Sequence, residues 1–225
     1  MNMADATGKL HLDGRRVLVT GGARGLGESF ARALVAAGAR VAIGDVLHER
    51  GRAVAAELGA AACYVEMDVA DAASVQAAVT AAVASLGGLD GLVNNAAITN
   101  SGGREMADLD AATWDHVMAI NVRGVWQTTV TATPHLAASG SGRIVNIASD
   151  TALWGAPRLL AYVASKGAVI AMTRSMAREL GPQNITVNVS RRASHWSKPL
   201  LMCRKRGIAN TKKAAPYRAR KCRKT

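Results

Sequence analysis

The chain has 225 residues, a formal net charge of +12, and 49% hydrophobic residues. This composition excludes a disordered protein, and the length allows a domain with a substantial core. No apolar run approaches the roughly 20 residues that span a bilayer, and residues 1–16 lack the apolar core of a signal peptide, so we expect a cytoplasmic protein.

Apolar runs and helical patterns alternate along most of the chain. The expected strands are near-continuous apolar segments, and in chain order they cover 16–20, 40–44, 61–67, 91–94, 143–148 and 186–189. The expected helices have apolar residues three and four positions apart and often end at glycine. They cover 25–38, 46–58, 72–86, 109–138 and 157–180, with Pro134 as an expected kink.

This alternation predicts the α/β class, with a doubly wound, Rossmann-type parallel sheet covered by helices on both faces. Apolar strands without polar alternation are typical of a sheet that is buried on both sides. In such folds the ligand binds at the carboxyl ends of the strands, where the strand order reverses. We therefore look for functional residues just after each expected strand.

A glycine-rich segment, 20–27, joins the first strand to the first helix and reads Thr-Gly-Gly-Ala-Arg-Gly-Leu-Gly. A glycine-rich turn alone is often an ordinary loop. Between a strand and a helix, however, its glycines let a pyrophosphate approach the backbone, and the helix N-terminus supplies free N–H groups. The segment predicts a dinucleotide site.

Asp45 ends the second strand, 18 residues after Gly27. A carboxylate there can accept hydrogen bonds from the adenosine ribose and would repel the additional phosphate of NADP, which favours NAD. Arg24 is a counter-indication, because a cation near the ribose could attract that phosphate. Asp45 could instead, or also, cap the second helix.

Two further strand ends offer candidate cofactor contacts. Asp68 follows the third strand and could contact the adenine, or it could cap the next helix. Asn94-Asn95-Ala96-Ala97 follows the fourth strand, where small residues could leave room for a cofactor; a plain turn is the alternative.

Tyr162 and Lys166 are four residues apart on an expected helix and so share a face. An ammonium beside a phenol favours the phenolate and lowers the phenol's pKa, which would make Tyr162 an acid and base at neutral pH. Ser149, at the end of the fifth strand, could hydrogen-bond a substrate oxygen. Taken alone, such a Tyr/Lys pair is more often an ordinary surface pair.

The combined motifs resemble the short-chain dehydrogenase/reductase family over about residues 10–190. They are the glycine-rich turn, Asn-Asn-Ala at 94–96, Asn121, Ser149, and Tyr-x-x-x-Lys at 162–166. Asn-Asn-Ala-Ala departs mildly from the family's usual Asn-Asn-Ala-Gly. The resemblance implies that Tyr162 is the acid and base, Lys166 lowers its pKa, Ser149 orients substrate, and Asn121 holds a water in a proton relay. The cofactor candidates are Gly21, Arg24, Gly25, Leu26, Gly27, Asp45, Asp68, Val69, Asn95, Ala96, Tyr162 and Lys166.

The wording of the motifs is most similar to NAD-dependent hydroxysteroid or secondary-alcohol members of the family. The resemblance also implies a homo-oligomer, which we expect to form through the long helices 109–138 and 157–180. Trp154 and residues 99–104 are candidates for the substrate pocket, but they do not identify a substrate.

The last part of the chain differs from the rest. Thirteen of the 28 lysines and arginines lie in residues 191–225, which contain no acidic residue. Family members continue after the sixth strand with a Pro-Gly turn, a substrate loop and a final strand, none of which is recognisable here. We therefore expect an incomplete Rossmann-type domain over 1–190 and a basic, irregular or disordered tail over 191–225.

A frameshift would explain this change of composition. One permitted codon set for residues 190–199, read two bases later, encodes Ser-Pro-Gly-Ile-Thr-Leu-Glu-Gln-Thr, which restores a Pro-Gly turn at the family's position. Codon degeneracy leaves this as a hypothesis. Without the substrate loop the pocket would lack a wall, so we expect weak or no turnover.

The sequence thus predicts an NAD-dependent oxidoreductase that interconverts a secondary alcohol and a ketone. The alternatives are a catalytically inactive NAD-binding protein and a protein that binds nucleic acid through its basic tail. We expect no metal site, because the histidines and cysteines show no ligand spacing; they are His11, His48, His116, His135, His195, Cys63, Cys203 and Cys222.

Overall fold

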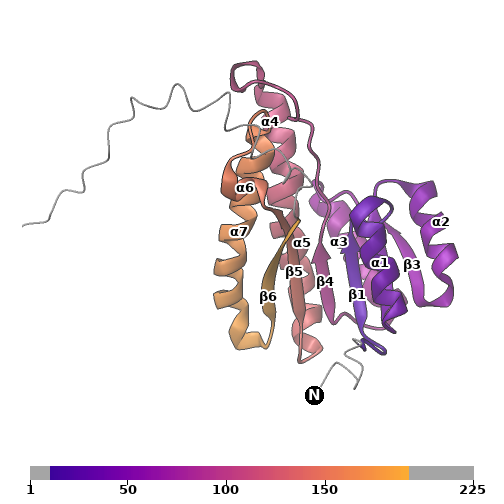
Figure 1. Cartoon of the computed structure of the whole chain (residues 1–225). Coiled ribbons are helices and arrows are strands. Elements are labelled where there is room, and N and C mark those ends of the chain that lie inside the picture. Colours follow the sequence, from indigo (N-terminus) through magenta and orange to yellow (C-terminus); the bar gives the residue numbers. More distant parts are fainter. Residues whose placement is uncertain (1–10, 193–225) are drawn as a thin grey trace, which may run out of the picture. The chain divides into compact units, whose positions relative to one another are not determined.

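The computed structural model describes residues 11–192, which form a six-stranded, wholly parallel sheet (Figure 1). The strand order is β3-β2-β1-β4-β5-β6. The order reverses between β1 and β4, as expected of a doubly wound fold. The strands are β1 (Arg16–Thr20), β2 (Arg40–Asp45), β3 (Ala62–Glu66), β4 (Gly91–Asn94), β5 (Arg143–Ser149) and β6 (Thr186–Arg192).

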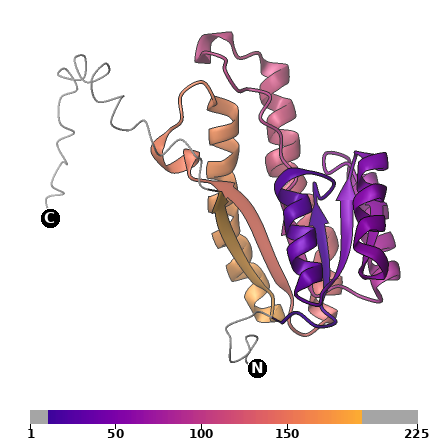
Figure 2. The ribbon, with the colours of Figure 1, turned by 45° about the vertical axis from the view of Figure 1, so that its right-hand side comes forward.

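Helices cover both faces of the sheet (Figures 1 and 2). On one face α1 (Gly25–Ala36) and α2 (His48–Leu58) pack against the apolar side chains of β1 and β2. On the other face lie α3 (Ala72–Leu86), α5 (Gly124–Ala138) and α7 (Leu160–Leu180). Two shorter helices, α4 (Ala111–Met118) and α6 (Thr151–Trp154), lie at the upper end of Figure 1.

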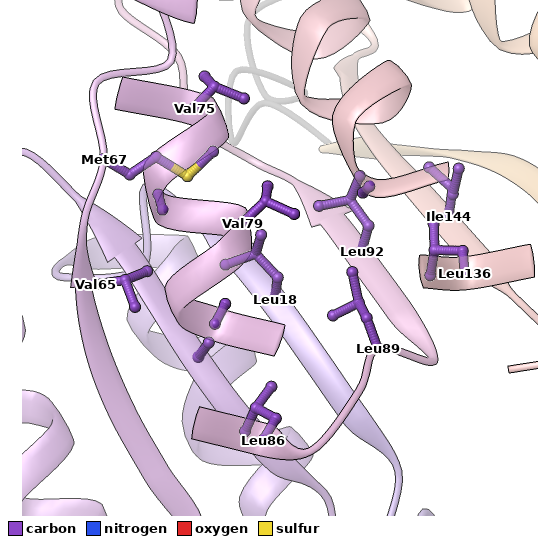
Figure 3. Close-up of a cluster of buried hydrophobic side chains, with 14 of the residues drawn as sticks. Leu18, Val65, Met67, Val75, Val79, Leu86, Leu89, Leu92, Leu136 and Ile144 are labelled. Carbon is purple, nitrogen blue, oxygen red and sulfur yellow. The ribbon is translucent and has the colours of Figure 1, made fainter. Parts of the chain in front are cut away.

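The larger core lies between the sheet and the α3/α5 side (Figure 3). Leu18 of β1 and Leu92 of β4 meet Val79 of α3 and Leu136 of α5, and all four side chains are almost completely buried. Burying an aliphatic side chain of this size stabilises a fold by about 1.5–3 kcal/mol. This core holds the central strands in place, and the carboxyl ends of those strands carry the residues predicted to be functional.

The ends of α3 agree with the expected residues because local signals are strong there. The side chain of Asp71 accepts a hydrogen bond from the N–H of Ala73 at 2.9 Å, which caps the helix. Gly87 ends it in the left-handed conformation, at φ 77°. The alternative cap considered above, Asp68, does not cap α3.

The expected single helix over 109–138 was wrong in detail. A short 3₁₀ turn (Met106–Asp108) precedes α4, and a π-helical turn (Ala119–Arg123) separates α4 from α5. Pro134 lies inside α5. The π turn contains Asn121, whose side chain is hydrogen-bonded to the backbone of the loop after β4, so a tertiary contact accompanies the change of helix type.

Two other expected boundaries differ by three residues, and the remaining ones by at most two. The helix expected to begin at residue 157 begins at Leu160, after the short helix α6 and a turn in which Arg158 has φ 58°. The last strand was expected to end at 189 but continues to Arg192, because Arg191 and Arg192 pair with Ala148 and Ser149 of β5. Residues 191 and 192 thus belong to the strand through backbone pairing, although their basic composition had placed them in the expected tail.

The sixth strand thus includes residues 191 and 192 of the expected tail, and the rest of that tail lies outside the described residues. Within residues 11–192, no helix is long and apolar enough to cross a bilayer. The same part of the chain contains no group of three potential metal ligands among His, Cys, Asp and Glu. His195, Cys203 and Cys222 lie outside it.

Candidate active site

A cleft of about 400 Å³ lies at the carboxyl ends of the strands, beside the point where the strand order reverses. All of the residues predicted to bind the cofactor line it: Gly21, Arg24, Gly25, Leu26, Gly27, Asp45, Asp68, Val69, Asn95, Ala96, Tyr162 and Lys166. The structure therefore brings together side chains that are spread over more than half of the described chain.

The glycine-rich turn leaves no room for side chains at two positions. A Cβ atom on Gly27 would lie 1.9 Å from the carbonyl oxygen of Gly21, and one on Gly21, whose φ is +64°, would lie 2.8 Å from Cα of Ala96. The helix α1 starts directly after the turn, and Arg24 at its N-cap makes no side-chain capping bond. The first N–H groups of α1 are thus available to an anionic group in the cleft.

Asp45 is buried, and both oxygens of its carboxylate accept backbone hydrogen bonds. Oδ2 accepts from the N–H of Ala23 at 2.9 Å, and Oδ1 accepts from the N–H of Leu47 at 3.0 Å. The carboxylate therefore ties the glycine-rich turn to the start of α2, while its residue lines the cleft. Each oxygen keeps a second lone pair for a ligand.

Tyr64 supports Asp45 from the neighbouring strand. Its hydroxyl donates to the carbonyl oxygen of Asp45 at 2.7 Å, and it lies 3.0 Å from Nδ1 of His48. Burial, followed by the charges of Glu66 and Asp45, raises the pKa of Tyr64, so the hydroxyl keeps its proton as a donor. A Cβ on Gly51 would lie 2.3 Å from the Tyr64 ring, so the ring packs directly on the backbone of α2.

Asn95, the first residue after β4, holds the glycine-rich turn in place by hydrogen bonds. Its side-chain amide donates to the carbonyl oxygens of Thr20 and Gly21, both at 3.0 Å. The hydroxyl of Thr20 accepts in return from the N–H groups of Asn95 and Ala96, at 3.0 and 3.1 Å. Asn94, in contrast, is buried and donates to Asn146 and Thr129, so it belongs to the interior and does not line the cleft.

Asp68 is exposed at the rim of the cleft. Its Oδ1 accepts from the N–H of Ala70 at 2.8 Å, which forms a local turn after β3. Val69 follows it and is buried beside Gly124, where a Cβ would lie 3.0 Å from the valine Cγ2. The two residues shape the side of the cleft formed by the end of β3.

Tyr162 and Lys166 are adjacent on the buried face of α7. The ammonium Nζ of Lys166 lies 5.8 Å from the centre of the Tyr162 ring and donates to the carbonyl oxygen of Ile147 at 2.7 Å. Both residues line the cleft, and both are almost completely buried. The pair therefore places a positive charge beside the phenol ring in the cleft.

Ser149 and Asn121, the other predicted catalytic residues, are not among the lining residues. The Ser149 hydroxyl is buried and accepts from the hydroxyl of Thr151 at 2.8 Å. Asn121 is fully buried; its side chain accepts from the N–H of Ile98 and donates to the Ile98 carbonyl, both at 2.9 Å, and donates to Ser165 at 3.1 Å. In this arrangement Asn121 fixes the loop that carries Ile98.

The cleft also contains residues that sequence reasoning did not name. They follow the strand ends closely or lie in β5 and the π turn: Val46, Leu47, Met67, Ile98, Ile120, Ile147 and Ala148. Their position after strands of a parallel sheet was a usable signal, although their apolar character alone does not distinguish them from core residues. Thr99 is the member of the expected pocket segment 99–104 that lines the cleft, whereas Trp154 does not line it.

Comparison with known proteins agrees with this geometry. The family model for short chain dehydrogenases matches residues 15–191. The chain is 46% identical over 177 residues to a 3-alpha-(or 20-beta)-hydroxysteroid dehydrogenase of Mycobacterium bovis, covering 79% of this chain and 67% of the relative. It is 39% identical over 180 residues to a sorbitol dehydrogenase of Cereibacter sphaeroides, covering 80% of this chain and 70% of that one.

A solved structure is similar as well. The crystal structure of 3-ketoacyl-(acyl-carrier-protein) reductase from Brucella melitensis, complexed with NADH, matches with a TM-score of 0.79 and 35% identity. The match covers 81% of this chain and 76% of that chain.

Proposed function

The chain belongs to the short-chain dehydrogenase family, and from this premise we propose that it interconverts a secondary alcohol and a ketone with NAD(H), with Tyr162 as the acid and base. Family membership makes it an oxidoreductase that acts on CH–OH groups with a nicotinamide cofactor. The observation that carries the proposal is the convergence of the glycine-rich turn and the Tyr162/Lys166 pair on one cleft.

The cleft fits a dinucleotide. Gly21 and Gly27 let the turn fold closely against its own surroundings, and the N-terminus of α1, which has no side-chain cap, offers N–H groups to a pyrophosphate. We favour NAD over NADP because the carboxylate of Asp45 lies where the adenosine ribose would bind and would repel an added phosphate. Arg24, exposed on the same rim, is the feature that favours NADP.

The proposed proton transfer uses Tyr162 and Lys166. In alcohol oxidation the Tyr162 phenolate would take the proton from the substrate hydroxyl; a nicotinamide held in the cleft would supply the hydride acceptor for the carbon that bears it. The Lys166 ammonium, 5.8 Å from the centre of the Tyr162 ring, would provide a positive charge beside the phenol during the transfer. In the reverse direction Tyr162 returns the proton to the ketone oxygen, so atoms and charge balance in both directions.

Ser149 and Asn121 have supporting roles in this proposal. The Ser149 hydroxyl, at the end of β5, would hydrogen-bond the substrate oxygen after turning from its contact with Thr151. The predicted water-holding role of Asn121 would have to use its backbone, because its side chain is engaged with Ile98 and Ser165.

For the substrate we propose an apolar secondary alcohol or ketone of hydroxysteroid type. Two observations support this class. A relative at 46% identity is named a hydroxysteroid dehydrogenase, and Leu153, Trp154 and Leu160 are exposed apolar residues between Ser149 and Tyr162. A small alcohol is the alternative.

We also propose a homo-oligomer that forms through the outer face of α4, α5 and α7. The lining of a shallow depression on this face includes Met118, Val122, Trp126 and Met172, with Asp115, His116 and Arg123 beside them, and Trp126 is 53% exposed. An exposed tryptophan among apolar neighbours is typical of a subunit interface.

The test compares the chain with its Tyr162→Phe variant. We expect both to bind NADH with equal affinity, measured by fluorescence titration, and to bind NADPH more weakly. We expect the unchanged chain to oxidise a hydroxysteroid slowly and the variant to lose about 100-fold or more of that rate. NADH binding without turnover in the unchanged chain would favour the inactive NAD-binding alternative, and absence of NADH binding would contradict both.

A further inference from the structure

The loop after β4, residues 99–105, makes three contacts with the segment that leads into α7 and with the first turn of α7 itself. Residues 155–159 form that segment, and Tyr162 lies in the first turn. Nε of Arg158 donates to the carboxylate of Glu105 at 2.7 Å, and the N–H of Gly103 donates to the carbonyl of Arg158 at 2.9 Å. In the third contact, the N–H of Tyr162 donates to the hydroxyl oxygen of Ser101 at 3.3 Å.

The third contact, from Tyr162 to Ser101, provides a hydrogen-bond partner at the N-terminus of α7. The N-cap of α7 is Leu159, which makes no side-chain capping bond. The first N–H groups of a helix have no partner within the helix, and a capping oxygen normally binds the N–H of its second or third residue. Tyr162 is the third residue of α7. Ser101 thus supplies from 61 residues away the bond that a local cap would make.

The hydrogen bond between Tyr162 and Ser101 matters because both residues are buried. Ser101 is 1% exposed and Tyr162 is 7% exposed, so water does not readily replace the serine hydroxyl. A buried N–H without a partner is costly, and the first turn of the helix would shift to find one. The peptide concerned belongs to Tyr162 itself, so such a shift moves the phenol that must meet the substrate.

The conformation of Arg158 supports the same reading. Its φ of 58° is unusual for a residue that is not glycine, asparagine or aspartate. Strained backbone persists only when the surroundings hold it, and here the ion pair to Glu105 and the bond from Gly103 do so. The entry to α7 is therefore set by the loop after β4 and not by local preference.

We infer that Ser101 is a positioning residue for Tyr162: its hydroxyl caps α7 at the Tyr162 peptide and thereby holds the phenol at the proposed reaction site. The inference rests on the proposed role of Tyr162, since a positioned tyrosine matters only if the phenol acts. Ser101 itself contacts neither substrate nor cofactor in this proposal.

The test compares a Ser101→Ala variant with a Ser101→Thr variant and with a control variant, Ser139→Ala. We expect kcat to fall by up to about 100-fold, as for other small misplacements of reacting groups, while the Kd for NADH stays unchanged. Ser101→Thr keeps the hydroxyl and should restore most of kcat. Ser139→Ala is the matched control, because Ser139 also accepts a backbone N–H bond at 3.3 Å, from Ser141, on the loop between α5 and β5; its kcat should not change.

Amide hydrogen exchange tests the inference without turnover. The Tyr162 amide should exchange slowly in the unchanged chain, faster in Ser101→Ala, and slowly again in Ser101→Thr. If the unchanged chain binds NADH but has no activity, the proposed function fails while the exchange result still decides the role of Ser101. Two results would overturn the inference: a Tyr162 amide that stays protected in Ser101→Ala, or a loss of NADH affinity that matches the loss of kcat.

Discussion

At Gly27 the absence of a side chain lets the glycine-rich turn close against its own backbone. A Cβ there would lie 1.9 Å from the Gly21 carbonyl oxygen and 2.6 Å from the side-chain nitrogen of Asn95. The Asn95 amide donates hydrogen bonds to the carbonyl oxygens of Thr20 and Gly21, so neither neighbour of the added Cβ can move away without breaking these bonds.

Gly27→Ala should therefore weaken NADH binding by about tenfold or more, equivalent to about 1.4 kcal/mol. Fluorescence titration of the two proteins measures the change. Gly181→Ala is the control, since Gly181 is exposed and a Cβ there meets nothing within 4 Å. Equal NADH affinity in Gly27→Ala and the unchanged chain would show that the turn does not contact the cofactor.

Single residues of the site differ in how far the sequence reveals them. Tyr162 and Lys166 share a helix face four residues apart, so their adjacency follows from helix geometry. Ser101 could not be found in this way, because its partner is 61 residues distant and the contact depends on how the loop after β4 meets the first turn of α7. Tyr64 was missed for a similar reason: it supports Asp45 only because β2 and β3 pair in one register.

Between elements, the Asp90–Arg16 pair joins the start of β1 to the turn before β4. Asp90 accepts from the backbone N–H of Arg16 at 2.9 Å, from Nε at 2.7 Å and from Nη2 at 3.0 Å. The side-chain hydrogen bond from Arg16 holds the pKa of the Asp90 carboxyl below its usual value of 3.8, against the opposing effect of burial. The ionised carboxylate thus stabilises the junction of β1 and β4.

Asp90→Asn should lower the free energy of unfolding by about 2 kcal/mol near neutral pH, the typical contribution of a hydrogen bond to a charged group. A depressed pKa adds stability above the unfolded value and loses it as pH falls through the folded value. The difference between the two proteins should therefore be constant above about pH 5 and shrink below about pH 4. Urea unfolding at several pH values checks this; a difference independent of pH would contradict it.

The elements themselves were predictable where local signals mark both ends. The helix α3 has a capping aspartate and a left-handed glycine, so its bounds follow from sequence. The bounds of α5, α7 and β6 depend on contacts: Asn121 bonds to the Ile98 backbone, Arg158 is held in an unusual conformation, and Arg191 and Arg192 pair with β5. None of these contacts can be recognised from the sequence around the residues that make it.

At the scale of the whole molecule, we expect subunits to associate through the outer face of α4, α5 and α7. Trp126 and Val130 lie on α5 and are more than half exposed. Trp126→Lys would place a charge in the proposed interface, where an unpaired charge is costly to bury. We expect this variant to sediment as a smaller species than the unchanged chain.

The control is Trp154→Lys, because Trp154 is similarly exposed at 51% but lies on α6. Its sedimentation should match that of the unchanged chain. If Trp126→Lys and the unchanged chain sediment alike, the proposed interface is wrong.

The fold class and the family followed from the sequence, because the order of strands, helices and motifs is itself the signature of this architecture. The sequence did not determine how far the domain extends: composition changes at residue 190, whereas strand pairing continues to Arg192 and the family match ends at 191.

The distribution of the cleft residues along the chain also has a consequence during synthesis on the ribosome. The turn at 21–27, Asp45 and Asn95 all precede residue 100, and β1 can pair with β4 once residue 93 has emerged. Tyr162 and Lys166 follow more than 60 residues later, and at roughly 5–20 residues per second that interval lasts several seconds. The nascent chain therefore completes the residues proposed to hold the nucleotide end of the cofactor before those proposed for proton transfer exist.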